Sequence, residues 1–453
     1  MRVLKFGGTS VATAPRRSVL ADVVSRAAEQ TEVVVVTSAL AGVTENLLRL
    51  IEGKASVSET LDDFERRHFE ELARTEGGIA DVLSRRRLRH QLQRLSALLP
   101  WNGEEATRHR ILASGERLAL PLILTALRRR GLAPEAMDGS ELILTRGLSR
   151  NPEIDLVATE ERLEERLQSG TASRISVVTG FVGRDHQGRT STLGRGASDL
   201  TATLMGSLLG ANEVEIWSDV PGVLSGPPNL VSEPITVPRL SYGEAAALAH
   251  FGAKVLHPLA LAPAAEARVP VSIHNTLDPQ ATGTFISDGT TSPGIKAISL
   301  VPETHHFQIR LPWTRQRSSR LLADLEDLGI RPLLVTSEVS GHTISFVVQA
   351  SEAEAVSTLE TQWRNDGCDV SSQDDFTALA LVGAEASSAV EAGLQRILAQ
   401  QGLEALGLVR PGCLDRPGRR AIVALVEDSQ GLRALRSLHD HLVRAPRSHA
   451  IAA

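Results

Sequence analysis

Residues 2–10 read RVLKFGGTS, a short apolar run followed by two adjacent glycines. The pattern predicts a β-strand over Arg2–Phe6, and Gly7 and Gly8 would let backbone amides come close to a bound group. A helix that begins next would add the positive end of its dipole, and Lys5 would add an ammonium group. Together these features indicate a loop that binds phosphate.

The alternative is an ordinary glycine turn in which Thr9 or Ser10 caps the following helix. The chain contains no Walker A sequence, and no Rossmann glycine fingerprint follows a predicted strand. These observations argue against the familiar P-loop enzymes and NAD-dependent enzymes.

The first half of the chain continues to alternate strands with helices. Further strands are predicted at Val33–Thr37, Ile175–Thr179 and Glu213–Trp217. Helices are predicted at Ala14–Glu29, Thr44–Glu52, Leu200–Leu209 and Tyr242–Phe251. Alternation on this scale predicts a mostly parallel sheet with helices on both faces, which binds ligands at the carboxyl ends of its strands.

The composition excludes several classes of protein. With 453 residues, 42% hydrophobic and 23% charged, the chain is typical of a globular protein of two or three domains. A net charge of −6 and 3% aromatic residues argue against nucleic-acid binding. The apolar runs are too short to span a membrane, and the start of the chain does not resemble a signal peptide, so we expect a cytoplasmic protein. Cys368 and Cys413 form neither a metal cluster nor a disulfide framework.

Lysine is rare in this chain. Of 48 basic residues four are lysines, namely Lys5, Lys54, Lys254 and Lys296. A lysine that persists among so many arginines suggests a position that needs a compact ammonium group. Lys254 lies at the predicted end of a helix, where the simpler explanation is a favourable interaction with the helix dipole.

Two further segments place polar residues where ligands bind. Ser38 and Thr44 lie in TSALAGVT (37–44), at the end of the second predicted strand. Glu116 lies in SGE (114–116), at the start of an apolar helical pattern, where it could hold a cationic amino group. Taken alone, Thr44 is explained as a helix cap and Glu116 as a first-turn acid.

The richest segment is TSTLGRGASDLTA (190–202), which follows TGFVG (179–183). Arg195 lies between two glycines just before a predicted helix and is suited to a bidentate contact with a carboxylate. Ser198 and Asp199 either cap that helix or line the same site. The density of glycine, serine and threonine around one arginine favours a ligand-binding loop.

The character of the chain changes after residue 278. Residues 278–294 are rich in turn formers with one short strand, and we place a domain boundary near residue 295. Beyond it a βαββαβ order of elements is predicted twice. The first copy comprises His306–Leu311, Ser318–Leu328, Arg331–Ser337, His342–Gln349 and Ala353–Arg364, and the second comprises Ala378–Val382, Ser387–Gln400, Leu403–Val409, Arg420–Val426 and Gln430–Leu442. Two ferredoxin-like units behind an α/β domain indicate a sensor attached to an enzyme.

Taken together, the chain resembles the aspartokinase family of the amino-acid kinase fold. The matching motifs are KFGGTS, TSALAGVT, SGE, TGFVG, TSTLGRGASDLTA, WSDVPGV and FGAKVLHP, in the family's order. The two C-terminal repeats resemble tandem ACT regulatory domains, and VTSEVS (335–340) is similar to the lysine-sensitive branch. The expected domains are a catalytic domain at 1–294 and ACT domains at 295–376 and 377–453, which could share strands.

The resemblance implies transfer of the ATP γ-phosphate to the side-chain carboxylate of L-aspartate, with Mg²⁺ carried on the nucleotide. Lys5 and Lys254 would neutralise the transferring phosphoryl group. Gly7, Gly8 and Ser38 would surround the phosphates or the reacting carboxylate. Thr44, Glu116, Arg195 and Ser198 would hold aspartate, with Asp199 as an orienting group, and Ser218 and Asp219 would touch the nucleotide. The expected partners are an amino-acid effector at the ACT domains and a second copy in a homodimer or larger homo-oligomer.

The sequence departs from the family in two places. Leu224 and Asn229 stand where the family has a tyrosine and an arginine that contact the nucleotide. Residues 315–319, RQRSS, replace the usual glycine-containing effector loop. Two alternatives therefore stay open: a related kinase for another acidic amino acid, and a regulatory subunit without turnover.

Overall fold

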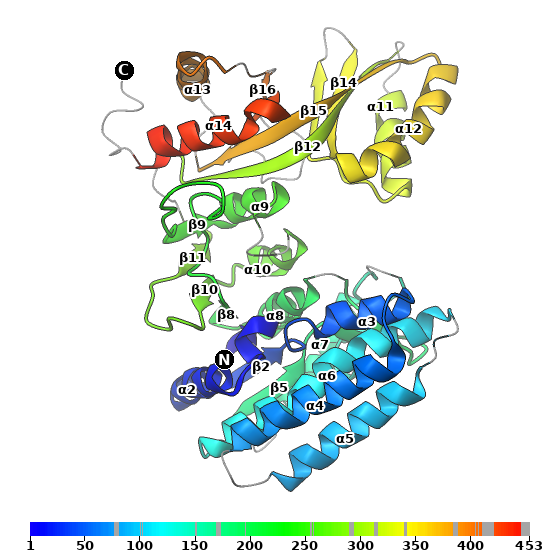
Figure 1. Cartoon of the computed structure of the whole chain (residues 1–453), viewed down its shortest axis with the longest axis vertical. Coiled ribbons are helices and arrows are strands. Elements are labelled where there is room, and N and C mark those ends of the chain that lie inside the picture. The colour runs from blue at the N-terminus through cyan, green and yellow to red at the C-terminus, as the bar shows by residue number, and fades with distance from the viewer. Residues whose placement is uncertain are drawn as a thin grey trace. The chain divides into compact units, whose positions relative to one another are not determined.

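The computed structural model describes residues 1–76, 81–99, 101, 103–149, 152–168, 174–194, 196–253, 256, 258–289, 294–311, 316–338, 342–383, 388–403, 405, 407–409 and 421–444. The chain forms two compact units (Figure 1). The first contains Met1–Gly222 and Leu256–Asp288, and the second contains Val223–Val255 and Gly289–Ala453.

The first unit is built on a mostly parallel sheet, as predicted. Its strands lie in the order β3 (Glu135–Met137), β5 (Ile175–Thr179), β2 (Val33–Thr37), β1 (Arg2–Phe6), β8 (Glu213–Ser218), β10 (Val271–Asn275) and β11 (Thr284–Ser287). Every neighbouring pair in that order is parallel except β10 with β11, which is antiparallel. The predicted bounds of β1, β2 and β5 are confirmed.

Helices and a small sheet complete the first unit. The small sheet contains β4 (Leu144–Thr145), β6 (Val182–Asp185) and β7 (Thr190–Thr192). The helices are α1 (Gly8–Val11), α2 (Ala14–Gln30), α3 (Val43–Ile51), α4 (Val57–Glu76), α5 (Val82–Ala97), α6 (Glu105–Arg129), α7 (Leu156–Leu163), α8 (Ala197–Leu208) and α10 (Ala262–Ala267). In Figure 1, α4, α5 and α6 lie side by side, and each packs against the other two.

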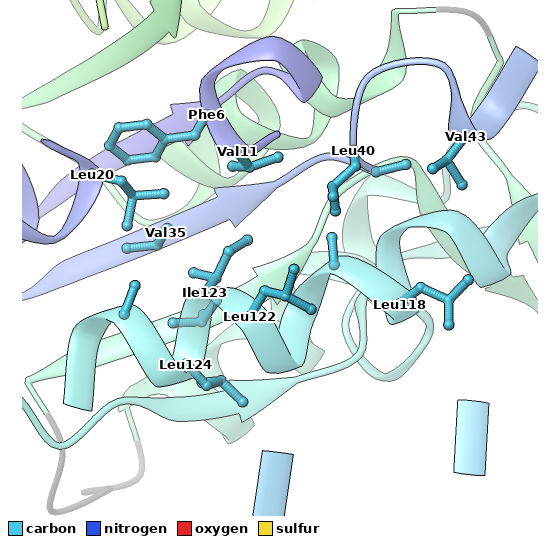
Figure 2. Close-up of a cluster of buried hydrophobic side chains, with 14 of the residues drawn as sticks. Phe6, Val11, Leu20, Val35, Leu40, Val43, Leu118, Leu122, Ile123 and Leu124 are labelled. Carbon is cyan, nitrogen blue, oxygen red and sulfur yellow. The ribbon is translucent and has the colours of Figure 1, made fainter. Parts of the chain in front are cut away.

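The core of the first unit shows on which face of the sheet the side chains of β1 lie. Leu4 and Phe6 of β1 belong to a buried cluster with residues of α2 and α6, as Figure 2 shows for Phe6, Leu20 and Leu122. Because side chains alternate along a strand, Lys5 points to the opposite face of the sheet, where α8 packs against β1.

Three helices of the first unit, α3, α6 and α8, begin earlier than predicted, which changes the position of several residues. Gly42 and Gly196, with φ of 84° and 71°, precede α3 and α8, and a left-handed glycine lets a helix start at once without a side-chain cap. Thr44 is therefore not a cap, and neither is Ser198 nor Asp199. The interpretation of Glu116 as a first-turn acid is also wrong, because α6 begins at Glu105.

The second unit contains one antiparallel sheet in the order β13 (Leu334–Glu338), β14 (Thr343–Gln349), β12 (Ala297–Arg310), β15 (Asp369–Val382), β17 (Ala421–Glu427) and β16 (Gly407–Val409). Its other elements are β9 (Arg239–Ser241), α9 (Tyr242–His250), α11 (Gln316–Asp327), α12 (Ala350–Asn365), α13 (Ser388–Gln400) and α14 (Asp428–His439). Both predicted repeats contribute strands to this sheet.

Two strands of this sheet are longer than predicted and serve both repeats. β12 begins at Ala297 and not at His306, and β15 begins at Asp369 and not at Ala378. The two pair from Ala297 opposite Val382 to Arg310 opposite Asp369, with an irregularity after Val301. Pro302 and Glu303 hid this continuity in the sequence, because they resemble a strand end.

A buried ion pair anchors the start of β12 within the second unit. Lys296 Nζ lies 2.8 Å from Glu244 Oε2, and both side chains are buried. Glu244 also completes a capping box with Ser241 at the start of α9. One of the four lysines therefore has a structural role. Within the described ranges, every helix is too short or too polar to cross a lipid bilayer.

Asp81 connects α5 to α6 in the first unit. Its carboxylate accepts hydrogen bonds from Ser84 N at 3.0 Å, Thr125 Oγ1 at 3.0 Å and Arg128 Nη1 at 3.0 Å. Burial alone would raise the pKa of Asp81, but these hydrogen bonds outweigh burial and lower the pKa to about 2. The ionised carboxylate thus stabilises the fold.

We predict that Asp81→Ala lowers the free energy of unfolding at pH 7 by about 1–2 kcal/mol, the usual cost of losing a helix cap. Because the folded-state pKa is depressed, the stabilisation is present above the ordinary value of 3.8 and is lost as the pH falls toward 2. Urea unfolding at pH 7 and at pH 3 measures this. Asp81→Asn, which keeps a capping acceptor, is the control and should lose less. An equal loss at both pH values would contradict the prediction.

Candidate functional site

The carboxyl ends of four parallel strands lie in one row. Phe6 of β1 pairs with Thr37 of β2 and with Trp217 of β8, and Thr37 pairs with Thr179 of β5. The loops that follow these strands therefore leave the sheet at the same edge. This edge is where open α/β sheets bind their ligands.

Lys5 and Asp199 meet at this edge. Lys5 Nζ lies 2.5 Å from Asp199 Oδ1, and the two side chains are 11% and 12% exposed. Asp199 is the third residue of α8, so the ion pair joins the end of β1 to the first turn of a helix. A Cβ atom placed on Gly7 would lie 3.6 Å from the same Nζ, so the ammonium group lies beside the glycine loop.

The glycine loop is packed tightly against the loop that follows β2. A Cβ atom on Gly8 would lie 2.8 Å from the Ala39 carbonyl oxygen, and the Ala41 amide donates to the Gly8 carbonyl at 3.1 Å. Gly8 is thus required for the close approach of two backbones. The Gly7 amide donates to the Trp217 carbonyl at 3.0 Å, so a phosphate would meet other amides of this loop.

Glu116 is buried in the middle of α6. The Ala39 amide donates to its Oε1 at 3.2 Å, while its Oε2 has no hydrogen-bond partner among the described residues. Burial raises the pKa of Glu116 to about 8, although the hydrogen bond from Ala39 opposes the shift. A buried carboxyl with an unused oxygen is suited to receive a cationic group.

The other predicted site residues are placed as follows. Ser198 lies against the end of β5, because a Cβ atom on Gly180 would be 2.9 Å from the Ser198 Cβ atom. Ser38 directly follows β2, and Thr44 is the second residue of α3. Ser218 is the last residue of β8. Asp219 follows it and is exposed, with its Oδ1 atom 3.3 Å from Ser218 Oγ. All five come from a strand end, a loop or a helix start at this edge of the sheet.

Two predicted cations, Arg195 and Lys254, lie outside the described residues. The roles expected for these two residues, Arg195 at aspartate and Lys254 at the phosphoryl group, therefore stay predictions. Leu224 and Asn229 belong to the second unit, where Leu224 forms an isolated bridge with Thr236. Their effect on nucleotide binding also stays a prediction.

A buried hydroxyl network at this edge was not predicted. Thr276 Oγ1 donates to Ser10 Oγ at 2.7 Å, and Ser10 Oγ donates to the Trp217 carbonyl at 3.2 Å. The role of Ser10 as a helix cap is wrong, because α1 has no side-chain cap and begins at Gly8. No local pattern marks Thr276, which follows β10 and is 266 residues from Ser10.

The geometry brings one ammonium group, one carboxylate and one buried carboxyl to the same strand ends. The ammonium group of Lys5 can bind an anionic group, and Glu116 can pair with an amine. The site therefore suits ligands that bring an anionic group and an amine.

Comparisons with known proteins agree with this description. The model of the amino acid kinase family matches residues 1–275. The chain is 31% identical to lysine-sensitive aspartokinase 3 of Escherichia coli K12, over 86% of this chain and 89% of that protein. It spans 56% of the bifunctional aspartokinase/homoserine dehydrogenase of Haemophilus influenzae, and thus little more than half of that relative.

Solved structures give the same result. The crystal structure of E. coli aspartokinase III in complex with aspartate and ADP superimposes with a TM-score of 0.81 at 26% identity, covering 97% of this chain and 99% of that one. The structure of the same enzyme in complex with lysine and aspartate gives a TM-score of 0.74 at 27% identity, covering 98% and 99%.

We predict that Glu116 is protonated at neutral pH and that Glu116→Gln removes a pH-dependent loss of stability. Between pH 4.5, the ordinary pKa, and about pH 8, the folded-state pKa, the folded protein keeps a proton on Glu116 that the unfolded protein has already released. Wild-type stability relative to the variant should therefore fall as the pH rises through this range, by up to about 1.4 kcal/mol per pH unit. Urea unfolding of both proteins at pH 5, 6, 7 and 8 measures the difference. A constant difference would show that Glu116 titrates normally.

Proposed function

Because the chain belongs to the amino acid kinase family and, within it, to the aspartokinases, we propose that it is an aspartate kinase. It transfers the γ-phosphate of ATP to the side-chain carboxylate of L-aspartate and yields ADP and 4-phospho-L-aspartate. The proposal is supported by the relatives of that name and by the likeness to a kinase solved with aspartate and ADP.

The observation that carries the proposal is the ion pair of Lys5 with Asp199. It holds a scarce lysine at the strand ends, beside the glycine loop, with its ammonium group largely out of water. Charge neutralisation at low exposure is what phosphoryl transfer requires, because negative charge is spread over the transferred group. An arginine fork would be poorly suited to a compact site of this kind.

The substrate carboxylate needs no general base, because it is already ionised at pH 7. One of its oxygens attacks the γ-phosphorus, the bond from that phosphorus to the bridging oxygen breaks, and ADP leaves with the electron pair. In this reaction Glu116 holds the amino group of the substrate. Thr44, Arg195 and Ser198 hold the rest of aspartate, and Asp199 orients Lys5. Catalysis then consists of positioning and charge neutralisation.

The nucleotide brings its own magnesium ion in this proposal. The described residues contain no group of three or more side chains that could hold a metal ion. Mg²⁺ is commonly bound through phosphate oxygens, waters and one or two carboxylates, and Asp199 and Asp219 are two carboxylates among the described residues at this edge. The ion would supply further neutralisation of phosphate charge. Ser218, Asp219 and Lys254 would contact the nucleotide, and Ser38 would lie at the phosphates or the reacting carboxylate of the substrate.

We further propose that the regulatory part binds an amino-acid effector and pairs with a second copy of the chain. The E. coli enzyme was solved with lysine, which supports an effector of this class. The domains proposed are 1–294, 295–376 and 377–453. Arg315 of the expected effector loop lies outside the described residues, and α11 begins at Gln316.

The two alternative functions have less support. A kinase for another acidic amino acid would use the same Lys5, Asp199 and Glu116, so the site does not favour it over aspartate. A subunit without turnover would have no need of a buried lysine ion pair beside a glycine loop. The altered segment at Leu224–Asn229 remains the feature that favours it.

The proposed activity is tested by ATP-dependent formation of an acyl hydroxamate. We expect product with L-aspartate and none without an acceptor, because hydroxylamine traps the acyl phosphate. L-glutamate is the matched control, since it carries the same groups on a longer side chain. Product with glutamate alone would support the related kinase, and nucleotide binding without product would support the regulatory subunit.

Lys5→Ala is predicted to lower kcat by roughly a hundredfold or more, with a smaller change in the KM for aspartate. The ammonium group acts on the charge that develops during transfer and touches aspartate less in the ground state. Steady-state kinetics measure both constants. Lys54→Ala is the control, because Lys54 is 69% exposed and pairs with Glu52. An unchanged kcat in Lys5→Ala would remove Lys5 from the mechanism.

A further inference from the structure

His109 is a buried histidine that no sequence pattern singled out. It lies on α6 and is 0% exposed, and its Nδ1 atom contacts Thr192, the last residue of β7. The Thr192 amide donates to Nδ1 at 3.1 Å, and Thr192 Oγ1 lies 2.7 Å from the same atom. The Nδ1 atom thus contacts both the amide and the hydroxyl group of Thr192, which is 83 positions away in the sequence.

These contacts fix the tautomer of the ring. A backbone amide can only donate, so Nδ1 carries no proton and acts as an acceptor. The proton of a neutral imidazole is then on Nε2, which lies 3.4 Å from Glu105 Oε1. Burial lowers the pKa of His109, which keeps the ring in this neutral form at pH 7.

His109 and Glu116 lie on the same face of one helix. They are seven residues apart, which is nearly two full turns and about 10 Å along α6. Glu116 accepts a hydrogen bond from the Ala39 amide after β2. His109 accepts one from the Thr192 amide at the end of β7. A single rigid helix therefore holds two loops of the site at a fixed spacing.

The segment held by His109 leads directly to the site. Leu193 donates its amide to the Phe181 carbonyl at 2.9 Å, and α8 begins at Ala197 with Ser198 and Asp199 in its first turn. The position of Thr192 thus limits where α8 and its side chains can start. Without an acceptor at His109 Nδ1, the Thr192 amide would be buried and unpaired.

We propose that His109 is a positioning residue for the substrate amino acid: it holds the end of β7 against α6, so that the first turn of α8 and Glu116 keep the spacing that aspartate requires. This proposal rests on the proposed aspartate kinase activity. His109 touches neither substrate nor nucleotide, and it acts through Thr192.

Two substitutions of His109 separate this role from simple packing. The side-chain oxygen of Asn is attached to the same carbon position as Nδ1 and can accept the Thr192 amide. The polar atoms of Gln lie one bond further out, near the place of Nε2. We expect His109→Asn to stay within about twofold of wild type, and His109→Gln to raise the KM for aspartate about tenfold, with the KM for ATP changed less than about twofold.

Three outcomes of these kinetic measurements would overturn the proposal. Wild-type kinetics in both variants, equal losses in both, or a parallel loss of ATP affinity would each contradict it. If His109→Gln does not fold, as judged by circular dichroism, His109→Ala replaces it in the comparison with His109→Asn.

A second measurement does not depend on activity. Hydrogen exchange of full-length protein reports on peptides that cover residues 190–194. Exchange there should be faster in His109→Gln than in His109→Asn or wild type, and equal exchange would overturn the positioning role. If wild-type protein forms no product with aspartate, the proposed function fails, and this measurement still decides the role of His109.

Discussion

The ion pair between Lys5 and Asp199 is the interaction on which the site depends. It forms because strand alternation sends Lys5 to the α8 face of the sheet and because a left-handed glycine starts α8 at the strand ends. Each partner is largely buried, so the loss of either would leave an uncompensated charge with little access to water. The pair therefore keeps an ammonium group in place before any anionic ligand binds. The ammonium group is already removed from water in the folded protein, so ligand binding does not have to desolvate it.

The helix α6 provides the frame around this pair. It is 25 residues long and contacts the loop after β2 at Glu116 and the end of β7 at His109. Gly115 allows this closeness, because a Cβ atom there would lie 2.9 Å from the Ala39 Cβ atom. Loops usually move more than the elements they connect. Here the loop after β2 and the end of β7 are both hydrogen-bonded to α6, so the helix sets the distance between them.

The sequence predicted the features that local patterns encode. The run Val33–Thr37 is apolar and β-branched throughout, and its strand has the predicted bounds. The starts of α3 and α8 were not predicted, because the left-handed conformations of Gly42 and Gly196 leave no mark that distinguishes them from ordinary turn glycines. Glu116 was placed in the wrong part of a helix, because α6 begins at Glu105. Contacts such as Thr276 with Ser10 join distant segments and have no local signal at all.

The shared strands β12 and β15 limit how this protein can be taken apart and recombined. Each runs through 14 residues, and their pairing extends across both repeats. A chimera with its crossover between the repeats would separate the two halves of one hydrogen-bonded ladder and create open edges prone to aggregation. The paired repeats therefore form a single structural unit. Gene fusion or shuffling that exchanges both repeats together keeps this ladder intact, whereas the replacement of one repeat alone would divide it.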